Sequence, residues 1–336
     1  MATTSHPPLV LAVDGGQSSS LALVATTDGQ ILGAGPGGPA NHYHEPGGPE
    51  RLRRAMTDST LAALEAAGQT PEQITHAVLG MTGAMEQAQA LVQELLPHAS
   101  VHSYHDSVTA LAGASVARPG VVVIAGTGAV AYGRLTDGRE ALAGGWGYIM
   151  GDEGSGHDIG INALRAITQA ADGRGAPTLL SELVPQHFGL TSLKELHAAI
   201  YRSAIDRTQI ASLCRVVAAA ASRGDAVATT LLANAAADLA HLALTVIERL
   251  GQIDAGLDVY TTGGVFQSGR FISEPFARAI ERRSPASRVH EAAFAPVVGA
   301  LFLALQAAGT TLTDEVLANI RATLPRRAIS KQSEQD

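Results

Sequence analysis

Residues 121 to 128 read VVVIAGTG, a run of β-branched side chains that ends in two glycines around a threonine. Residues 129 to 135 continue as a second, mostly apolar run, and Thr136-Asp137-Gly138 separates this run from residues 140 to 143. β-Branched residues favour strands, and Asp-Gly between two such runs is the strongest short signal for a hairpin. The segment therefore predicts a strand, a glycine turn, a second strand, a hairpin and a third strand.

The same plan occurs near the start of the chain. Residues 9 to 13 form an apolar run that ends at Asp14-Gly15-Gly16, residues 21 to 25 form another, and Asp28-Gly29 precedes residues 31 to 33. Two unrelated hairpins could produce similar patterns, but the shared order of features favours an internal repeat. Such a repeat implies two related domains that face one another, each with a glycine turn directed to a shared cleft.

Outside the two copies, helical and strand patterns alternate, which is typical of an α/β fold. Pro119-Gly120 marks a predicted boundary, so we expect a first domain over residues 1–117 and a larger second domain over residues 118–336. A C-terminal helix near residues 296–308 is expected to join the first domain. The patterns predict further helices at residues 50–67, 85–96, 106–117, 157–171, 192–204, 210–222, 226–250, 270–283 and 312–323, and strands at 76–81, 101–105, 258–261 and 289–291.

Composition excludes several classes of protein. The net charge is −8 and the chain has only two lysines, Lys194 and Lys331, which argues against a nucleic-acid or membrane-surface partner. The apolar runs are shorter than the roughly 18 residues of a membrane span, and residues 1 to 8 lack the pattern of a secretory signal, so we expect a cytoplasmic protein. A single cysteine, Cys214, excludes disulfides and cysteine-rich metal sites within the chain.

Three glycine turns follow predicted strands. Consecutive backbone N–H groups in such a turn can cradle a phosphate, and a neighbouring hydroxyl adds a donor. No Gly-x-x-x-x-Gly-Lys-Ser/Thr element is present, which excludes a P-loop, and the first turn leads into a strand rather than the helix of a dinucleotide fold. The three turns are Asp14-Gly15-Gly16-Gln17-Ser18, Gly126-Thr127-Gly128 and Gly263-Gly264.

Asp14 places a negative charge beside a predicted phosphate site. This charge would repel the phosphate unless a cation intervened, and Mg²⁺ keeps several waters while using few carboxylates. We therefore predict that Asp14 holds Mg²⁺ through water.

A second glycine-rich stretch, residues 144 to 156, reads GGWGYIMGDEGSG and contains the only tryptophan, Trp146. An indole can cover the C–H face of a sugar while a nearby carboxylate, Asp152 or Glu153, accepts its hydroxyl protons. The alternative is a tight connector whose tryptophan is merely buried. The sequence does not separate the two acids.

Asp106 follows a predicted strand and begins a predicted helix. Ligands gather at the carboxyl ends of strands in α/β sheets, which makes Asp106 a candidate general base that takes a proton from an attacking hydroxyl. Aspartate is also favoured as a plain helix N-cap, so its position alone leaves both interpretations open.

Together these segments resemble the sugar kinase/Hsp70/actin superfamily and, within it, the BadF/BadG ATPase group that includes N-acetylglucosamine kinase. The resemblance runs from Asp14-Gly15-Gly16 to the helix containing Gly299-Ala300, and residues 126–128, 144–147 and 151–155 carry its most specific part. It implies two duplicated actin/hexokinase-like (ribonuclease H-like) domains around a central cleft. It also implies ATP- and Mg²⁺-dependent transfer of phosphate to the 6-hydroxyl of an amino sugar, and a homodimer.

The resemblance also implies roles for particular residues. The catalytic base would be Asp106, which also touches the sugar. Further sugar contacts would be Asn41, Gly145, Trp146, Gly147 and Asp152. The nucleotide would be bound by Gly15, Gly16, Ser18, Gly126, Thr127, Gly128, Ala221, Gly263 and Gly264.

Two departures from the family pattern bear on the substrate. Gln17 replaces a third glycine of the first turn, and Ala129 stands where a serine is common after Gly-Thr-Gly. The missing hydroxyl removes a possible sugar contact and so leaves the particular amino sugar open. The resemblance makes N-acetylglucosamine the first expectation, with glucosamine or N-acetylmuramic acid as alternatives. A different class of function also stays open, that of an ATP-dependent switch or sugar sensor without kinase activity.

Overall fold

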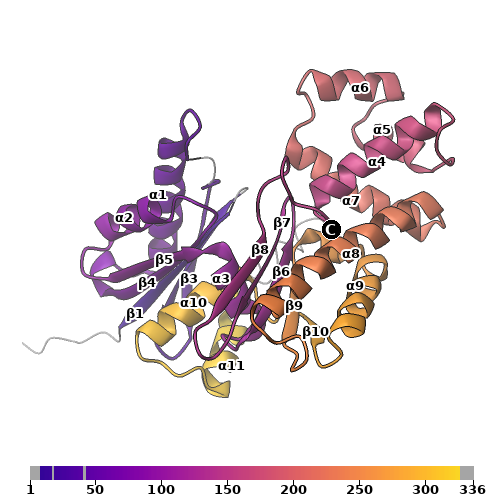
Figure 1. The fold of residues 1–336 in the computed structure, drawn as a ribbon. Helices are drawn as coiled ribbons and strands as arrows, with labels where there is room; N and C mark the ends of the chain where they lie inside the picture. Colours follow the sequence, from indigo (N-terminus) through magenta and orange to yellow (C-terminus); the bar gives the residue numbers. More distant parts are fainter. Residues whose placement is uncertain (1–7, 17–18, 41–42, 326–336) are drawn as a thin grey trace, which may run out of the picture. The chain divides into compact units, whose positions relative to one another are not determined.

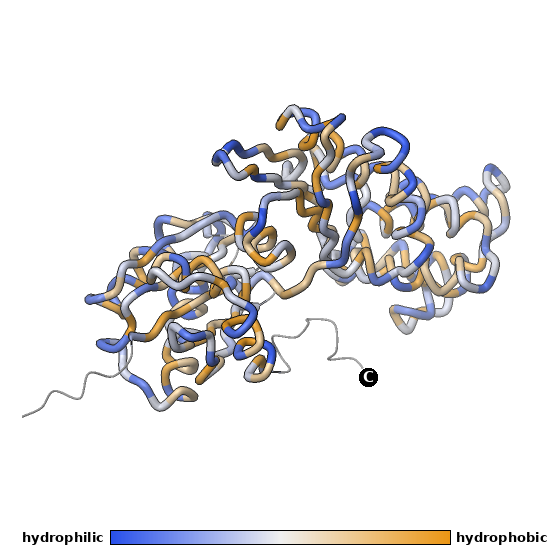
Figure 2. The backbone as a smooth tube through the Cα atoms, turned by 90° about the horizontal axis from the view of Figure 1, so that it is seen from below, coloured by the Kyte–Doolittle hydropathy of each residue, from blue (hydrophilic) through white to orange (hydrophobic). Residues whose placement is uncertain are grey.

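The computed structural model describes residues 8–16, 19–40 and 43–325. The chain forms two compact units and passes from the first to the second between Arg118 and Pro119. It returns to the first unit between Glu291 and Ala292. Within each unit the hydrophilic segments lie mostly in turns at the outside (Figure 2).

The first unit contains a five-stranded sheet of order β3-β2-β1-β4-β5. Strands β1, β4 and β5 are parallel, whereas β2 is antiparallel to both β1 and β3. Figure 1 shows the helices of this unit around the sheet, with the yellow α10 beside α3. The elements are β1 (Leu9–Gly15), β2 (Ser20–Thr26), β3 (Ile31–Gly37), α1 (Gly48–Ala67), η1 (Pro71–Gln73), β4 (Ile74–Met81), α2 (Met85–Leu95), β5 (Ser100–His105), α3 (Asp106–Ser115), α10 (Pro296–Ala307) and α11 (Asp314–Thr323).

Strand β1 is apolar from Leu9 to Val13 because both of its faces are buried there. Leu9, Leu11 and Val13 pack into the core formed with α1 and α2. Val10 and Ala12 point the other way, into the core formed with α10 and α11. Side chains alternate between the faces of a strand, so a continuous apolar run is what a strand between two helical layers requires.

Helix α1 lies directly against strand β3 because alternate residues of that strand are glycines. A Cβ atom added at Gly35 would lie 2.1 Å from the carbonyl oxygen of Ser59 in α1. The corresponding distances are 2.4 Å from Gly33 to the Ala63 oxygen and 2.7 Å from Gly37 to the Ala55 oxygen. Real side chains do not approach backbone this closely, so the helix rests on bare strand backbone.

The second unit repeats the sheet topology of the first. Its strand order is β8-β7-β6-β9-β10, with β6, β9 and β10 parallel and β7 antiparallel to β6 and β8. The elements are β6 (Gly120–Ala125), β7 (Ala129–Arg134), β8 (Glu140–Gly144), α4 (Gly156–Ala171), α5 (Leu180–His187), α6 (Leu193–Tyr201), α7 (Arg207–Ser222), α8 (Ala226–Arg249), β9 (Asp258–Thr262), η2 (Gly264–Ser268), α9 (Arg270–Arg283) and β10 (Arg288–Glu291).

The predicted α/β fold with an internal repeat is confirmed by the matching order and direction of the strands in the two sheets. The expectation that the second domain continues to residue 336 is wrong for its described part. Helix α11 belongs to the first unit, where the Thr323 hydroxyl accepts a hydrogen bond from the Ile31 amide at 2.9 Å and Asn319 donates to the Asp28 carbonyl at 2.9 Å. Helix α5, which ends in Pro185-Gln186-His187, was not predicted.

One described helix, α8, is long and apolar enough to cross a membrane by length and composition. Its inward residues, among them Leu232, Leu239, Val246 and Ile247, are fully buried in the core of the second unit. Helix α8 therefore has the burial of a core helix.

The glycines of β3 give a prediction for stability. Gly35→Ala should lower the free energy of unfolding by about 1–3 kcal/mol, because the new methyl group overlaps the backbone of α1. Gly38→Ala is the matched control, since Gly38 is exposed and a Cβ there meets nothing within 4 Å. Its effect should stay within about 0.5 kcal/mol. Urea unfolding measures both, and equal effects of the two substitutions would contradict the packing described.

Candidate active site

The first glycine turn lies where the parallel strands of the first unit end. Asp14 of β1 is in register with Gly80 of β4, and Gly80 with Tyr104 of β5, so the following residues meet at one edge of the sheet. The Gly16 amide donates to the Ser19 carbonyl at 3.1 Å, which closes the turn. Gly15 is buried beside Met81, whose sulfur would lie 2.5 Å from an added Cβ atom.

Asp106 begins α3 directly after β5 and lies at this same edge. Its Oδ2 accepts a hydrogen bond from the Thr82 hydroxyl at 2.6 Å. Its Oδ1 lies 2.9 Å from Nδ1 of His105. This oxygen is buried, and its near neighbour is the imidazole of His105. One carboxylate oxygen is thus held by Thr82 and the other lies against His105, which fixes the carboxylate at the edge of the sheet.

The surroundings of Asp106 also set its protonation. Burial alone would raise the pKa of Asp106, but His105, the Thr82 hydroxyl and the Ser107 amide together hold this pKa below its ordinary value. The contact with the Asp106 carboxylate raises the pKa of His105 in turn, although burial opposes the change. Asp106 is therefore ionised at neutral pH, as a general base must be. The helix N-cap is His105, not Asp106, because Nδ1 of His105 accepts from the Ser107 amide.

The second glycine turn joins β6 to β7. The Gly126 amide donates to the Gly128 carbonyl at 2.9 Å, and the Gly126 carbonyl accepts from the Gly156 amide, at the start of α4, at 2.8 Å. Among the described residues, the amides of Thr127 and Gly128 have no hydrogen-bond acceptor. These two N–H groups, rather than that of Gly126, are therefore the ones that can point at a phosphate.

Asp152 lies directly behind this turn and is 4% exposed. Its Oδ1 accepts from the Ala129 amide at 3.1 Å, and its Oδ2 pairs with the Arg207 guanidinium at 2.8 Å. A Cβ atom at Gly128 would lie 2.9 Å from both carboxylate oxygens, so only glycine fits there. Asp152 has a positive φ of 63°, a conformation that costs energy in a residue other than glycine.

The structure separates the two acids that the sequence left equivalent, since Glu153 is exposed and Asp152 is buried. Trp146 is 71% exposed, so the alternative of a connector with a buried tryptophan is wrong. Gly145 and Gly147, at φ of 76° and 81°, shape the loop that presents this indole.

Arg207 is the site residue that sequence reasoning missed. Its guanidinium pairs with Asp152 and also lies over the ring of Tyr148, 4.7 Å from the ring centroid. Tyr148 contacts His157 edge-on, with ring centroids 5.2 Å apart. No local pattern marks Arg207, because 55 residues separate it from Asp152 in the chain.

The residues predicted for the adenosine end lie on two neighbouring elements of the second unit. Ala221 is on α7 and is 4% exposed, whereas Gly264 is exposed with open space around it. Gly263 has φ of 102°, and a Cβ atom there would lie 2.3 Å from the Ala125 carbonyl oxygen. Helix α7 contacts η2 through Cys214, whose sulfur lies 3.3 Å from the Ser268 hydroxyl, and burial raises the pKa of this thiol.

Ser18 and Asn41, together with Gln17, lie outside the described residues. For the metal, the described part of the chain holds no cluster of three or more ligand side chains. Asp14 is partly exposed at the end of β1, and one carboxylate with water and phosphate oxygens is a donor set that Mg²⁺ accepts. The residues present therefore fit a hydrated Mg²⁺ rather than a metal enclosed by protein ligands.

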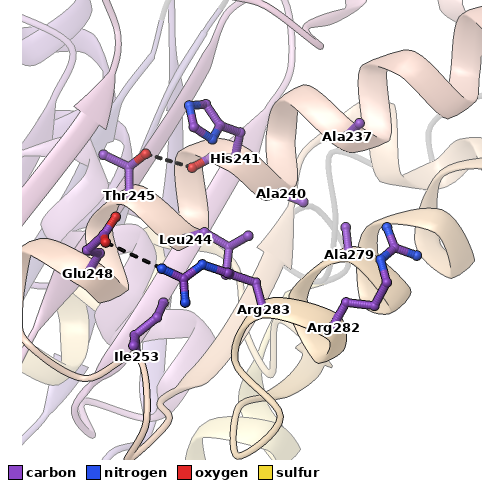
Figure 3. Close-up of a pocket in the computed structure, with 10 residues that line it drawn as sticks. All are labelled: Ala237, Ala240, His241, Leu244, Thr245, Glu248, Ile253, Ala279, Arg282 and Arg283. Atoms are coloured by element: carbon purple, nitrogen blue, oxygen red, sulfur yellow. Dashed lines mark hydrogen bonds and ion pairs between the residues drawn. The ribbon is translucent and has the colours of Figure 1, made fainter.

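A groove of about 400 Å³ lies between α8 and α9 of the second unit (Figure 3). It contains none of the residues predicted from the sequence, and its Arg283 is paired with Glu248 at 3.5 Å. The lining residues are Ala237, Ala240, His241, Leu244, Thr245, Glu248, Ile253, Ala279, Arg282 and Arg283. The groove is separate from the glycine turns, and we assign it no role.

A duplicated sheet with a glycine turn in each copy is the architecture of the sugar kinase and actin-like ATPases, and comparison with known proteins supports this class. Residues 11–304 match the model of the BadF/BadG/BcrA/BcrD ATPase family. The chain belongs to this family, which confirms the predicted resemblance.

Two curated relatives match nearly the whole chain. An N-acetylmuramic acid/N-acetylglucosamine kinase from Clostridium acetobutylicum is 32% identical over 86% of this chain and 97% of the relative. An N-acetyl-D-glucosamine kinase from Dictyostelium discoideum is 28% identical over 88% of this chain and 98% of the relative. A crystal structure from Chromobacterium violaceum, provisionally named an N-acetylglucosamine kinase, has a TM-score of 0.70 at 26% identity and covers 89% of this chain and 99% of its own.

The contact between His105 and Asp106 gives a prediction that needs no activity assay. In Asp106→Asn the pKa of His105 should fall, because the carboxylate that raises it is gone while burial, which lowers it, remains. Histidine ring signals followed by NMR across a pH titration measure this, with the His105 signal identified by its loss in His105→Gln. Asp58→Asn on α1 is the control and should leave this pKa unchanged. A His105 pKa that stays the same in Asp106→Asn would contradict the coupling.

Proposed function

We propose that the chain is an ATP-dependent kinase that phosphorylates the 6-hydroxyl of an amino sugar, with N-acetylglucosamine as the first substrate to test. The observation that carries the proposal is Asp106, an ionised and partly buried carboxylate that Thr82 and His105 hold at the edge where the parallel strands of the first unit end. This is the arrangement that a base for an incoming hydroxyl needs.

The relatives support an amino sugar as the acceptor. The two that match nearly the whole chain are both named as kinases of N-acetylglucosamine, and the one from Clostridium acetobutylicum also of N-acetylmuramic acid. A glucosamine kinase from Vibrio cholerae is 30% identical over 53% of this chain. We therefore keep N-acetylmuramic acid and glucosamine as the alternative substrates.

In the proposed reaction, the carboxylate of Asp106 accepts the proton of the sugar 6-hydroxyl. The hydroxyl oxygen forms a bond to the γ-phosphorus of ATP as the bond between that phosphorus and the β–γ bridging oxygen breaks, which gives the sugar 6-phosphate and ADP. Thr82 holds the carboxylate in the orientation for this transfer through its 2.6 Å hydrogen bond. The low pKa of Asp106 keeps it ready to accept the proton at neutral pH.

The phosphates would lie against the two glycine turns. The amides of Thr127 and Gly128 supply donors from the second unit, and the turn at Gly15 and Gly16 lies next to Asp14 in the first. Asp14 would hold Mg²⁺ through water, and the metal supplies positive charge that offsets charge on the phosphates. Ala221, Gly263 and Gly264 would lie against the adenosine.

The sugar would stack on the exposed indole of Trp146, with Gly145 and Gly147 giving the loop its shape. Asp152 has two partners in the protein, but a carboxylate offers about four acceptor positions, so it can still accept a sugar hydroxyl. Asn41 completes the set of sugar contacts that we propose. We also propose a homodimer, as the family resemblance implies, and keep the cytoplasm as the proposed location.

A panel of sugars tests the reaction. Purified protein with Mg²⁺ and ATP should release ADP in the presence of N-acetylglucosamine, and a coupled assay should rank glucosamine, N-acetylmuramic acid and glucose beside it. Asp106→Asn should lower kcat by roughly 10²–10⁴-fold while ADP still binds, because the general base is lost and the phosphate turns are intact. Asp58→Asn is the matched control. Slow ATP hydrolysis that no sugar stimulates would contradict the kinase proposal.

The lone tryptophan supplies a direct test of sugar binding. Titration of the sugar should change the fluorescence of Trp146, since this is the only tryptophan in the chain. Trp146→Ala should raise the KM for the sugar by about tenfold and leave the KM for ATP unchanged, because only the stacking surface is lost. Met150→Ala, on the same loop and 73% exposed, is the control. A fall in ATP affinity in Trp146→Ala would contradict the placement of this residue in the sugar site.

A further inference from the structure

We propose that Arg207 is a positioning residue for the second glycine turn: it balances the charge of Asp152 behind the turn and so keeps the turn competent to bind phosphate. This inference rests on the proposed function in one respect, that residues 126–128 bind the phosphates of a nucleotide. It assigns a role to a residue that neither the sequence motifs nor the proposed reaction uses.

The contacts form a chain from α7 to the turn. The Arg207 guanidinium donates to Oδ2 of Asp152 at 2.8 Å, and Oδ1 of Asp152 accepts from the Ala129 amide at 3.1 Å. Ala129 is the first residue after Gly128, the position at which an added Cβ would collide with the Asp152 carboxylate. The side chain of Asp152 thus links the Arg207 guanidinium to the backbone of the turn that would hold the phosphate.

The N-terminal end of α7 and its close packing on α4 position Arg207 beside Asp152. Arg207 is the first residue of α7, after the N-cap Asp206, whose side chain accepts from the Gln209 amide at 2.8 Å. Helix α4 lets α7 approach because it has glycines at the contact. A Cβ atom at Gly160 would lie 2.3 Å from the Ile210 carbonyl oxygen, and one at Gly156 would lie 3.0 Å from that of Ala211.

The negative charge of Asp152 behind the turn would affect phosphate binding. A buried carboxylate behind a turn that binds phosphate would repel the phosphate unless a cation compensated it. The Asp152 side chain is 5% exposed, and Arg207 is the guanidinium that compensates it. Removal of one partner from a buried ion pair is costly because the other charge is left without compensation.

Other charged and titratable groups surround this pair. From α4 come His157 and Asp158, and Glu153 precedes them on the connecting segment. The pKa of His157 is lowered by burial first and by Arg207 second, while Asp152 and Asp158 oppose the shift. Asp238 on α8 has a raised pKa because of burial and then of its neighbours Asp158 and Glu153.

Arg207 also reaches the loop that carries Trp146. Its guanidinium lies over the ring of Tyr148, and cation–π contacts of this kind hold a planar guanidinium in place. Nε of Arg207 is buried and has no hydrogen-bond partner in the described part of the chain. The side chain therefore depends on Asp152 and Tyr148 for its position.

The test is ADP affinity, measured by calorimetry without any sugar. Arg207→Gln should raise the dissociation constant for ADP by at least about tenfold, because Asp152 is then uncompensated. Arg207→Lys keeps the charge and should recover part of the affinity. In the Asp152→Asn background, Arg207→Gln should change ADP affinity less than twofold, since no charge is left to balance.

A pH series adds a readout that a purely structural role would not change. In Arg207→Gln the pKa of His157 should rise, because the guanidinium that lowers it is gone. The positive charge that His157 gains as the pH falls would then partly replace that of Arg207, so ADP affinity should recover at lower pH. In the Asp152→Asn background this recovery should be smaller, because no carboxylate is left to balance.

Arg174→Gln is the matched control, because Arg174 pairs with Asp172 on the exposed surface of the same unit. It should bind ADP as the original protein does. Normal ADP affinity in folded Arg207→Gln would overturn the inference, as would a loss of equal size in the Asp152→Asn background. If Arg207→Gln does not fold, the ADP affinities of Arg207→Lys and of the variants in the Asp152→Asn background test the inference instead. Failure of every sugar to stimulate ADP release, with these ADP results intact, would count against the kinase proposal alone.

Discussion

Each unit depends on one strand that is buried on both faces. In β1 the side chains alternate between two separate cores, and in β6 the consecutive residues Val121, Val122 and Val123 are all fully buried. Such a strand cannot carry polar groups along its length, so polar residues collect where it ends. In both units the next residues form a glycine turn, and the parallel neighbours of the strand end at the same edge. Burial of the strand thus decides where ligand-binding groups lie.

Two aspartates show how different surroundings divide the work of similar side chains. Asp106 is held by Thr82 and His105 and is partly exposed at the end of β5, so it can take part in proton transfer. Both oxygens of Asp152 have partners in the protein, the Ala129 amide and the guanidinium of Arg207. The main role of Asp152 is therefore to hold the shape of the turn at residues 126–128. The carboxylates are chemically alike, and their partners separate their roles.

Much of the fold could be predicted from the sequence because its signals are local. The strands, the Asp-Gly hairpins and the glycine turns each depend on neighbouring residues, and the repeat made the match between the two sheets foreseeable. The placement of residues 309–325 in the first unit could not be predicted, because it depends on contacts such as that of Thr323 with Ile31, which are far apart in the chain. The glycines at 33, 35 and 37 were visible, but their role required the position of α1.

The candidate site was predictable to a similar degree. Asp106 and the turn at 126–128 follow strands, so their position was predictable, and the loop that presents Trp146 was recognised by its composition. The burial of Asp152 beside an exposed Glu153, and its pairing with Arg207, depend on the approach of α7 to α4. No spacing in the sequence encodes that approach, and it became visible only in three dimensions.

The burial of Cys214 has a practical consequence for work on this protein. Thiolates are the species that react with maleimide reagents, and Cys214 is enclosed between α7 and η2 with a raised pKa. It is the only cysteine in the chain, so a cysteine introduced at an exposed position would be the one that reacts. Fluorescent or spin labels can therefore be attached singly to either unit without first removing the native thiol, and the labelled protein would keep its core unchanged.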